Sequence, residues 1–488
     1  MRLSALPASL LVVAAVNAAA ADTQLTIYSG DFDAVAASQP GPGMPGFALV
    51  HETHEFALES GANTLTLSGL PAGIDASGVR FTAQGAARVT GQRFDFALAD
   101  QAELLRRALG QRVTVEQAVG SERQSYTGTL IAAGDGLTLA LDDGRVRVLA
   151  DYTGFELAQL PDGLYARPTL RWNVQAAQSG RARFALDYPT GGLSWRAEYV
   201  ARLSGAGEDC RMDFSGAAQV ANRSGAAFAQ AAVTLVAGQP NVQRSVQPQM
   251  MMAKSSMEAS DGGIAPQPSG EYHAYPLPGH VDLPDSSVQR VPLLAEAGDV
   301  ACVRRYESQP PWGDYRPPRP LIEPEYGPAG EQPVMAMLEF GNRKQDGLGV
   351  PLPAGRLRAF VRERGGNDAF LGEAMLEHTA SGRDVRVPLG QAFDLSAERT
   401  RENFELEPDR HGLFETIQLT VRNAKSEAAT VRVLEPLPRW HAWEVTESSV
   451  PWRKTNAQTI AFDVAVPAGG EATVRYRVRY RWPESITP

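Results

Sequence analysis

Cysteine is scarce in this sequence: its 488 residues include only two, Cys210 and Cys302. Two cysteines are too few for a disulfide scaffold, and the chain has no Cys-x-x-Cys pair of the kind that redox enzymes use. In a compartment that permits disulfides, the pair forms either one bridge or two buried free thiols. Cysteine count and compartment leave both alternatives open.

Long apolar runs are also lacking. After residue 21 no stretch approaches the roughly 18 apolar residues that a membrane-spanning helix needs, so no transmembrane segment is expected. The first 21 residues have a different pattern: Arg2 precedes an apolar core around Leu10, and a run of small residues follows that ends at Ala21. This order is typical of a secretory signal peptide over residues 1–21. We therefore expect an exported chain, either periplasmic or secreted.

An excess of positive charge is absent as well. The chain has 46 Lys and Arg against 56 Asp and Glu, which gives a net charge of −10. Nucleic acids and anionic membranes usually demand a basic face, so no nucleic-acid partner is expected. The length allows two to four domains, each with its own core.

Short segments that alternate apolar and polar residues fill most of the remaining chain. They predict a mainly β protein built of several antiparallel β-sandwiches. One short helix is expected at Asp100–Leu109, with Asp100 as its N-cap, and the strands after it predict a small SH3-like barrel. The predicted domains are a small β-domain, the helix with its SH3-like insert, a central sandwich and an Ig-like sandwich, at residues 22–99, 100–160, 161–402 and 403–488.

The stretch over residues 182–203 specifies its own structure best. Its two arms alternate around a Pro-Thr-Gly-Gly turn and predict a β-hairpin in which Leu186 lies opposite Trp195. One face is then wholly apolar, and the other pairs Arg183 with Glu198. Four residues of the apolar face are expected to anchor the core of the central sandwich: Phe184, Leu186, Trp195 and Tyr199.

Two irregular stretches interrupt the central sandwich. Residues 243–271 are rich in Pro, Ser, Gln, Gly and Met and have no periodicity, which predicts a disordered loop. Its methionines are soft ligands of the type that holds Cu(I), but low-complexity sequence explains them better, and no cofactor is expected. Residues 309–333 contain too many prolines for a central strand and predict an extended polyproline segment over the surface.

Several segments occur in a characteristic order between about residues 165 and 482, among them LDYPTGGLSWRAEY, QVANRSG, LGVPLPAGRLRAFV, FLGEAMLEHT and VRYRVRYRW. In these segments the chain resembles the bacterial domain of unknown function 4139, whose relatives include mucoidy inhibitor A-like proteins. Some relatives carry a coiled coil where this chain has the SH3-like insert. The resemblance implies an exported, β-rich protein without an established catalytic activity, and it supplies no catalytic residues.

His378 is the strongest candidate for a catalytic residue. It lies beside Glu373 and Glu377 and could act as a general base, with Asp384 and Asp394 as further carboxylates. No nucleophile motif such as Gly-x-Ser-x-Gly accompanies it, and a strand-end histidine bonded to the backbone is the simpler interpretation. A hydrolase of cell-envelope material is the second functional hypothesis.

His51 and His54 invite a metal-site interpretation. The zinc-protease motif places two histidines four apart on a helix, whereas these lie three apart on a predicted strand and point to opposite faces. We interpret both as solvated strand residues.

The last predicted strand offers the best candidate for a binding surface. Its four arginines alternate with apolar residues and share one face at intervals of about 6.6–6.8 Å: Arg475, Arg477, Arg479 and Arg481. They could bind an acidic envelope glycan or an acidic partner protein. The alternative is a solvated face balanced by carboxylates such as Glu415 and Glu435. The first functional hypothesis is therefore a non-enzymatic envelope or secreted scaffold that binds a protein or a surface glycan.

Overall fold

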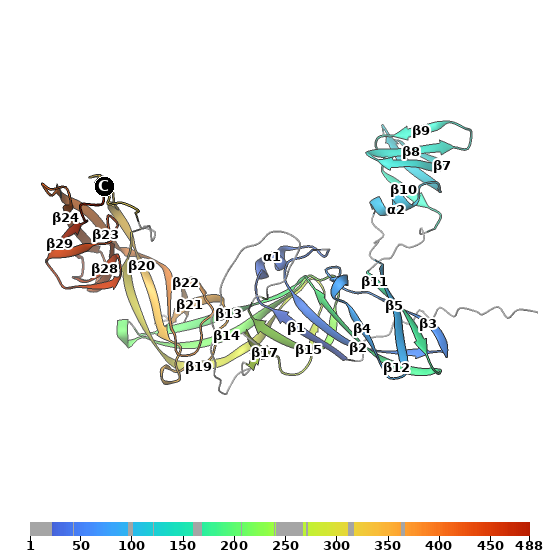
Figure 1. Ribbon diagram of the computed structural model, residues 1–488, viewed down its shortest axis with the longest axis horizontal. Coiled ribbons are helices and arrows are strands. Elements are labelled where there is room, and N and C mark those ends of the chain that lie inside the picture. Colours follow the sequence, from blue (N-terminus) through green and yellow to red (C-terminus); the bar gives the residue numbers. More distant parts are fainter. Residues whose placement is uncertain are drawn as a thin grey trace, which may run out of the picture. The chain divides into compact units, whose positions relative to one another are not determined.

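A computed structural model describes most of the chain after the first 21 residues. The described residues are 22–41, 43–95, 101–120, 122–159, 168–205, 207–238, 240, 267–269, 272–310, 317–362 and 367–488. The predicted signal peptide lies outside them, and so does the predicted disordered loop except for residues 267–269. The protein is mainly β, as the sequence predicts (Figure 1).

The chain divides into two compact units that are interleaved in sequence. The first unit comprises Met1–Trp195, Val220–Ser245 and Ala274–Gln289. The second comprises Arg196–Gln219, Val246–His273 and Arg290–Pro488.

An eight-stranded mixed sheet is centred on the first unit. Its strands are β1 (Asp22–Tyr28), β2 (Ala48–Leu58), β4 (Arg80–Gln84), β12 (Gly180–Thr190), β15 (Phe228–Ala237), β16 (Gln267–Ser269), β17 (Tyr272–Pro276) and β18 (Val281–Leu283). They follow the order β16-β17-β15-β1-β2-β12-β4, with β18 beside β15. β1 runs parallel to β15 and antiparallel to β2, so the first described strand lies inside the sheet.

Two smaller elements complete the core of the first unit. A three-stranded sheet consists of β3 (Gly61–Ser68), β5 (Ala87–Asp95) and, between them, β11 (Thr169–Ala176). The ring of Phe81 stacks on Trp172 at 3.8 Å and on Phe184 at 4.7 Å, which joins β4, β11 and β12 in one aromatic core. Helix α1 (Phe32–Ala37) was not predicted, because six residues are too few to show a helical period.

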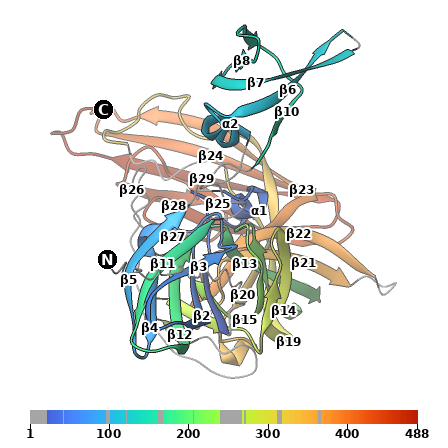
Figure 2. The same ribbon diagram turned by 90° about the vertical axis from the view of Figure 1, so that its right-hand side faces the viewer.

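The predicted helix is confirmed as α2 (Gln101–Arg107), and Asp100 lies outside the described residues. The strands that follow are β6 (Arg112–Val119), β7 (Glu122–Gly134), β8 (Gly136–Leu141), β9 (Val146–Leu149) and β10 (Gly154–Leu157). They form an antiparallel sheet in the order β10-β6-β7-β8-β9 (Figure 2). Within the described part of the chain this sheet is open rather than a closed barrel, and Leu105 and Ala108 pack into its core.

A thirteen-stranded sheet runs through the second unit. Its strands are β13 (Leu193–Ser204), β14 (Arg211–Asn222), β19 (Ser287–Ser308), β20 (Gly330–Gly341), β21 (Gly355–Arg362), β22 (Asp368–Leu376), β23 (Asp384–Leu406), β24 (Gly412–Asn423), β25 (Ala429–Pro436), β26 (Trp443–Ser448), β27 (Trp452–Asn456), β28 (Thr459–Val466) and β29 (Gly470–Arg481). Its main order is β22-β21-β13-β14-β19-β20-β23-β24-β29-β26. A branch leaves at β19 through β25, β28 and β27, and residues of β24, β25, β28 and β29 share one hydrophobic core. Three 3-10 turns are also described: η1 (Ala76–Gly78), η2 (Gly207–Asp209) and η3 (Lys344–Asp346).

The predicted hairpin between β12 and β13 is wrong. β12 pairs with β2 and β4, whereas β13 lies between β21 and β14 in the other sheet. The Gly-Gly turn instead carries the chain from one sheet to the next: a Cβ on Gly191 would lie 2.6 Å from the carbonyl oxygen of Met44, and Gly192 has φ +79°. Alternation identifies the buried face of each arm, but a hairpin and a crossing between sheets bury that face equally well.

The absence of the hairpin changes the predicted residue pairs but not the predicted burial. Arg183 lies opposite Glu55 rather than Glu198, and Glu198 instead forms an ion pair with Arg358 of β21. The four residues named as core anchors are all fully buried: Phe184, Leu186, Trp195 and Tyr199.

Three buried asparagines end strands in the same way. The side-chain amide of Asn222 donates to the carbonyl oxygens of Ala226, Leu283 and Pro284 at the end of β14. Asn342, after β20, and Asn423, at the end of β24, each donate to three carbonyl oxygens as well. In each case the side-chain oxygen also accepts a backbone N–H. The QVANRSG segment is thus one of three turns held together by a buried amide.

The predicted polyproline segment is described at residues 309–310 and 317–333. Its last four residues correct the prediction, because they belong to the central strand β20, where Pro333 lies at a register shift. Arginines of the sandwich fix the part before β20. Arg439 is 1% exposed and donates to the carbonyl oxygens of four residues of the segment: Leu321, Glu323, Pro324 and Tyr326. Arg399 adds a hydrogen bond to the carbonyl oxygen of Pro328. Buried guanidinium groups thus satisfy backbone groups that prolines leave without strand partners.

Candidate functional site

The most prominent charged surface of the second unit crosses several neighbouring strands. Apolar side chains of β20, β23 and β25 alternate into the core, so Glu339, Arg386 and Arg432 lie on the outer face. Strand register places Arg386 directly opposite Glu339, and Arg432 directly opposite both Glu307 and Asp463. In each of these directly opposed pairs the two charges therefore have opposite signs.

Ion pairs connect these side chains. Arg386 Nε lies 3.1 Å from Glu339 Oε1, and Arg386 also pairs with Glu307. Arg432 Nε lies 3.2 Å from Asp463 Oδ1, and Arg453 of β27 pairs with the same carboxylate. Partial burial alone would raise the pKa of Asp463, but hydrogen bonds from Arg453 and Arg432 outweigh it and lower that pKa.

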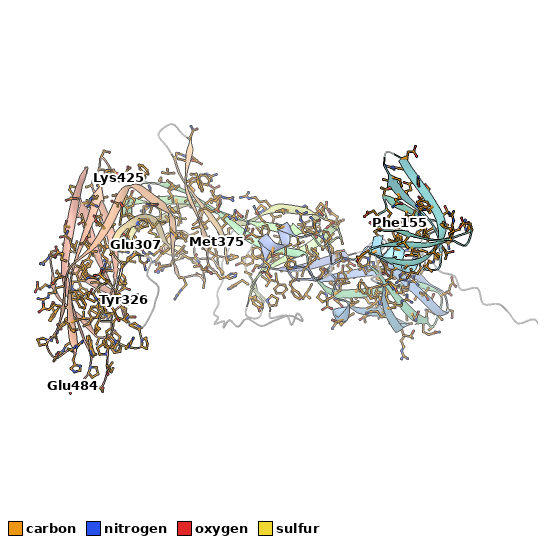
Figure 3. The ribbon with its side chains drawn as sticks, turned by 90° about the horizontal axis from the view of Figure 1, so that it is seen from above. Phe155, Glu307, Tyr326, Met375, Lys425 and Glu484 are labelled. Carbon is orange, nitrogen blue, oxygen red and sulfur yellow. A yellow bond between two sulfur atoms is a disulfide. The ribbon has the colours of Figure 1, made fainter. Side chains whose placement is uncertain are left out.

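A cavity of about 520 Å³ lies over this part of the sheet, and we refer to it as the basic hollow. Its ionisable lining residues are four cations and one carboxylate, Glu307; the cations are Arg386, Arg432, Arg453 and Lys454. Amide and hydroxyl side chains supply the rest of its polar lining: Gln309, Thr455, Asn456, Gln458 and Thr459. Figure 3 labels Glu307 of this lining, together with Tyr326 and Lys425 of the same unit.

A second cavity of about 500 Å³ adjoins the basic hollow, because Arg386 and Arg432 line both. Its ionisable lining is balanced, with Arg211 and the two shared arginines against Glu339, Asp346 and Asp384. The two cavities therefore have two arginines in common, and we refer to them together as the groove, of which the basic hollow is the basic end. A guanidinium presents several N–H donors in one plane, so an arginine already paired with one carboxylate retains donors for a further anion.

The groove lies inside a region that a family model recognises. The model for the domain of unknown function DUF4139 matches residues 184–484, more than half of the chain. The chain belongs to the DUF4139 family. No curated protein matches the sequence.

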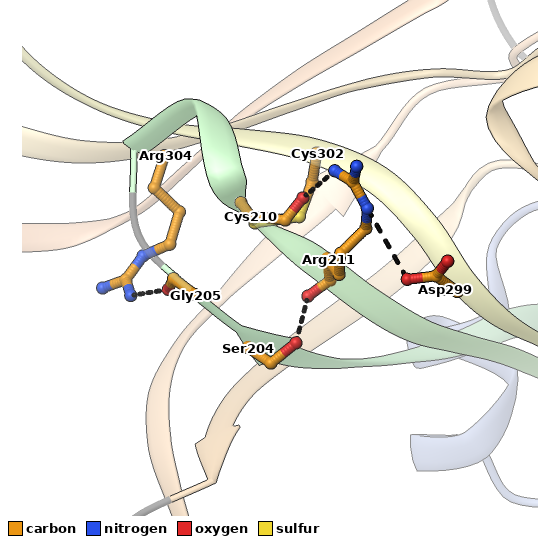
Figure 4. Close-up of a disulfide and its surroundings, with 7 residues drawn as sticks. All are labelled: Ser204, Gly205, Cys210, Arg211, Asp299, Cys302 and Arg304. Carbon is orange, nitrogen blue, oxygen red and sulfur yellow. Dashed lines mark hydrogen bonds and ion pairs between the residues drawn. A yellow bond between two sulfur atoms is a disulfide. The ribbon is translucent and has the colours of Figure 1, made fainter.

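Cys210 and Cys302 form a disulfide within the DUF4139 region, so the bridge is the alternative that the structure shows. Their Cα atoms are 5.0 Å apart, and the backbone N–H of Cys302 donates to the carbonyl oxygen of Cys210. Arg211 donates to the same carbonyl oxygen and pairs with Asp299 (Figure 4). Because Cys302 and Arg211 line the second cavity, the disulfide holds β14 against β19 at the balanced end of the groove.

The arginine row of the last DUF4139 strand lies on one face of β29, but carboxylates occupy it. Arg477 lies 3.1 Å from Glu405, and Arg479 lies 2.6 Å from Glu407. Arg475 pairs with Glu402, and Arg481 lies 4.0 Å from Glu407. Glu415 and Glu435 do not balance the row: both are buried, where they pair with Arg439 and Arg399.

The structure does not join the three residues of the hydrolase hypothesis through any described contact. The Nδ1 atom of His378 accepts the backbone N–H of Ala354, while Asp384 pairs with Arg343 and Asp394 is exposed. Desolvation lowers the pKa of His378, and nearby His273 lowers it further. His378 therefore fulfils the backbone-bonding role that the sequence also suggests.

The two N-terminal histidines behave differently from each other. His51 is partly exposed and pairs with Asp187 at 2.7 Å. His54 is 3% exposed, so its interpretation as a solvated residue is wrong. Its partner is Glu52, two residues away on the same strand face, whose carboxylate stabilises a buried ring.

Two further features are absent from the described residues. No group of three or more His, Cys, Asp or Glu side chains there is arranged to hold a metal ion. None of the helices described is both long and apolar enough to cross a membrane.

Proposed function

We propose that this DUF4139 protein is an exported, non-enzymatic binding protein of the cell envelope or the medium, and that it holds an acidic glycan in the groove. One observation carries the proposal: four cations and a single carboxylate line the basic hollow. The expected signal peptide supports export, and cell fractionation with an antibody against the mature chain tests it.

The lining favours a glycan over other anions. Arginine side chains recognise carboxylates and sulfates by paired hydrogen bonds. The amide and hydroxyl groups of Asn456, Gln458 and Thr459 add donors and acceptors that suit the hydroxyl groups of sugars. The balanced second cavity extends the groove, so a chain of several sugar units fits the proposal better than a single small anion does.

The proposal is tested by comparing dextran sulfate with uncharged dextran in calorimetric titrations of the full chain. We expect binding of dextran sulfate only, and weakening of that binding by salt. Arg453→Gln removes a half-exposed cation from the hollow, and Arg386→Ser with Arg432→Ser removes the two shared arginines. Each of these variants should bind dextran sulfate at least tenfold more weakly.

A matched control removes the same kind of charge elsewhere. Arg475→Ser combined with Arg481→Ser changes the net charge as the double groove variant does, but outside the groove. Its affinity should equal that of the natural protein. Equal losses of affinity in the two double variants would show that only net charge matters. Tighter binding of polyglutamate than of dextran sulfate would favour an acidic protein as the partner. Either result overturns the glycan proposal.

A further inference from the structure

A small cavity in the first unit contains an ionisable cluster that the groove does not use. It has a volume of about 260 Å³ and lies where β1, β2 and β12 meet the turns after β3 and before β15. Among the residues that the structure describes, Glu52, His54 and Tyr188 are its only ionisable lining residues, and no Lys or Arg lines it.

Strand register brings the three residues together. Glu52 and His54 are two apart on β2, and β12 runs antiparallel beside it with Tyr188 opposite Val50. All three side chains therefore project from one face. His54 is 3% exposed and Tyr188 2%, so the cluster is built into the interior of the unit.

The hydrogen bonds within the cluster have a fixed direction. Tyr188 donates its hydroxyl to Glu52 Oε1 at 3.2 Å, and burial, reinforced by Glu52, raises the pKa of Tyr188 well above its ordinary value. His54 Nε2 lies 2.9 Å from Glu52 Oε2. A carboxylate only accepts hydrogen bonds, so Nε2 carries a hydrogen in this contact, and in the tautomer with that single ring hydrogen Nδ1 is an acceptor.

That acceptor has no partner among the described residues. His54 Nδ1 is buried and makes no hydrogen bond. A buried polar atom without a partner lowers stability, so such atoms are rare and call for an explanation. A ligand that donates a hydrogen bond would remove this cost.

The remaining lining defines the kind of donor. Leu67, Leu70, Pro71 and Phe228 supply apolar walls, and Thr23 and Ser68 carry hydroxyl groups. Since the cavity contains a carboxylate and no cation, it favours a positively charged donor over a neutral or negative one. We propose that this cavity is a binding site for a small primary ammonium group on a short apolar body, with His54 Nδ1 as acceptor and Glu52 as the counter-charge.

The experiment uses three probes of matched size: propylammonium, 1-propanol and propionate. Saturation-transfer NMR on the full chain should show transfer to propylammonium and little to the other two. Glu52→Gln keeps the shape of the side chain but removes its charge, and His54→Gln removes the acceptor ring. Each should weaken propylammonium binding at least tenfold, with thermal melting recorded to show that the variant is folded.

Two controls separate this site from its surroundings. His51→Gln changes the neighbouring histidine, whose ring bonds Asp187 instead, and should leave binding unchanged. Arg453→Gln, in the groove, should leave it unchanged too, so the two proposals can fail independently. Equal transfer to 1-propanol, no transfer to propylammonium, or undiminished binding in folded Glu52→Gln would each overturn the assignment.

Discussion

Arg439 and Glu415 form a buried ion pair in the C-terminal sandwich, with Arg439 Nη2 2.9 Å from Glu415 Oε1. The side chains are 1% and 4% exposed. The same guanidinium holds four carbonyl oxygens of the Pro-rich segment, so one side chain joins that segment to β24.

Arg439→Met should destabilise the protein by about 3–5 kcal/mol, because it removes the nearer partner of the buried Glu415 charge and leaves only the longer ion pair with Arg401, at 3.9 Å. Urea denaturation followed by tryptophan fluorescence measures this loss. Arg422→Met breaks an exposed pair with Glu398 and should cost far less. Similar costs for the two variants would show that the buried pair has no special role.

Loss of the disulfide should lower stability strongly. The bridge closes a loop with a sequence separation of 92 residues, and loop entropy predicts a stabilisation of up to about 4–5 kcal/mol. Cys210→Ser with Cys302→Ser should therefore melt at a lower temperature than the oxidised protein, and reductant should lower the melting temperature of the natural protein only. A double variant with the same melting temperature as the oxidised protein would contradict this account.

Asn423→Ala tests the buried turns. It removes donors to Glu427, Val466 and Pro467 and the acceptor for the Lys425 N–H, at a turn where Asn423 itself is buried. Leaving such groups without partners should cost on the order of 3 kcal/mol in urea unfolding. Asn456→Ala removes a single hydrogen bond in an exposed turn and should cost about 1 kcal/mol or less.

Asp463 should weaken anion binding, because it occupies donors of Arg432 and Arg453. Asp463→Asn should bind dextran sulfate more tightly than the natural protein at neutral pH, by about threefold to tenfold. The lowered pKa keeps the carboxylate charged throughout the range above its ordinary value of 3.8, and the charge is lost only as the pH falls through the lowered value. The two affinities should converge there, since sulfate groups stay ionised. An affinity ratio that is independent of pH would contradict the role of Asp463, provided that circular dichroism shows both proteins folded.

Residue alternation predicted the β class and the buried faces, because side-chain period depends on strand geometry alone. Alternation does not show which strands pair with each other. The arms of the stretch over residues 182–203 have complementary charges, yet they belong to different sheets. Pairing depends on strands distant in sequence, such as β2 and β21, which the local pattern does not identify.

The groove escaped prediction for a related reason. The cations of the basic hollow come from three strands that are not consecutive in the sequence: Arg386 and Arg432 are single charges on β23 and β25, and β27 adds Arg453 and Lys454. The row of β29 was predicted as a binding surface because its arginines alternate along one strand and share one face, but acids of β23 and of the turn after it pair with them. His54 was missed because burial of a polar residue depends on what covers the strand.

The interleaving of the two units constrains how the chain acquires its structure. During synthesis β1 emerges first, yet its parallel neighbour β15 follows only after β13 and most of β14 have entered the other unit. Neither unit corresponds to one continuous segment of the chain. Cutting the chain at one position therefore yields no fragment in which every strand keeps its sheet neighbours. Nascent chains must keep strand edges unpaired until distant partners arrive, which makes a holding chaperone valuable before the final structure closes.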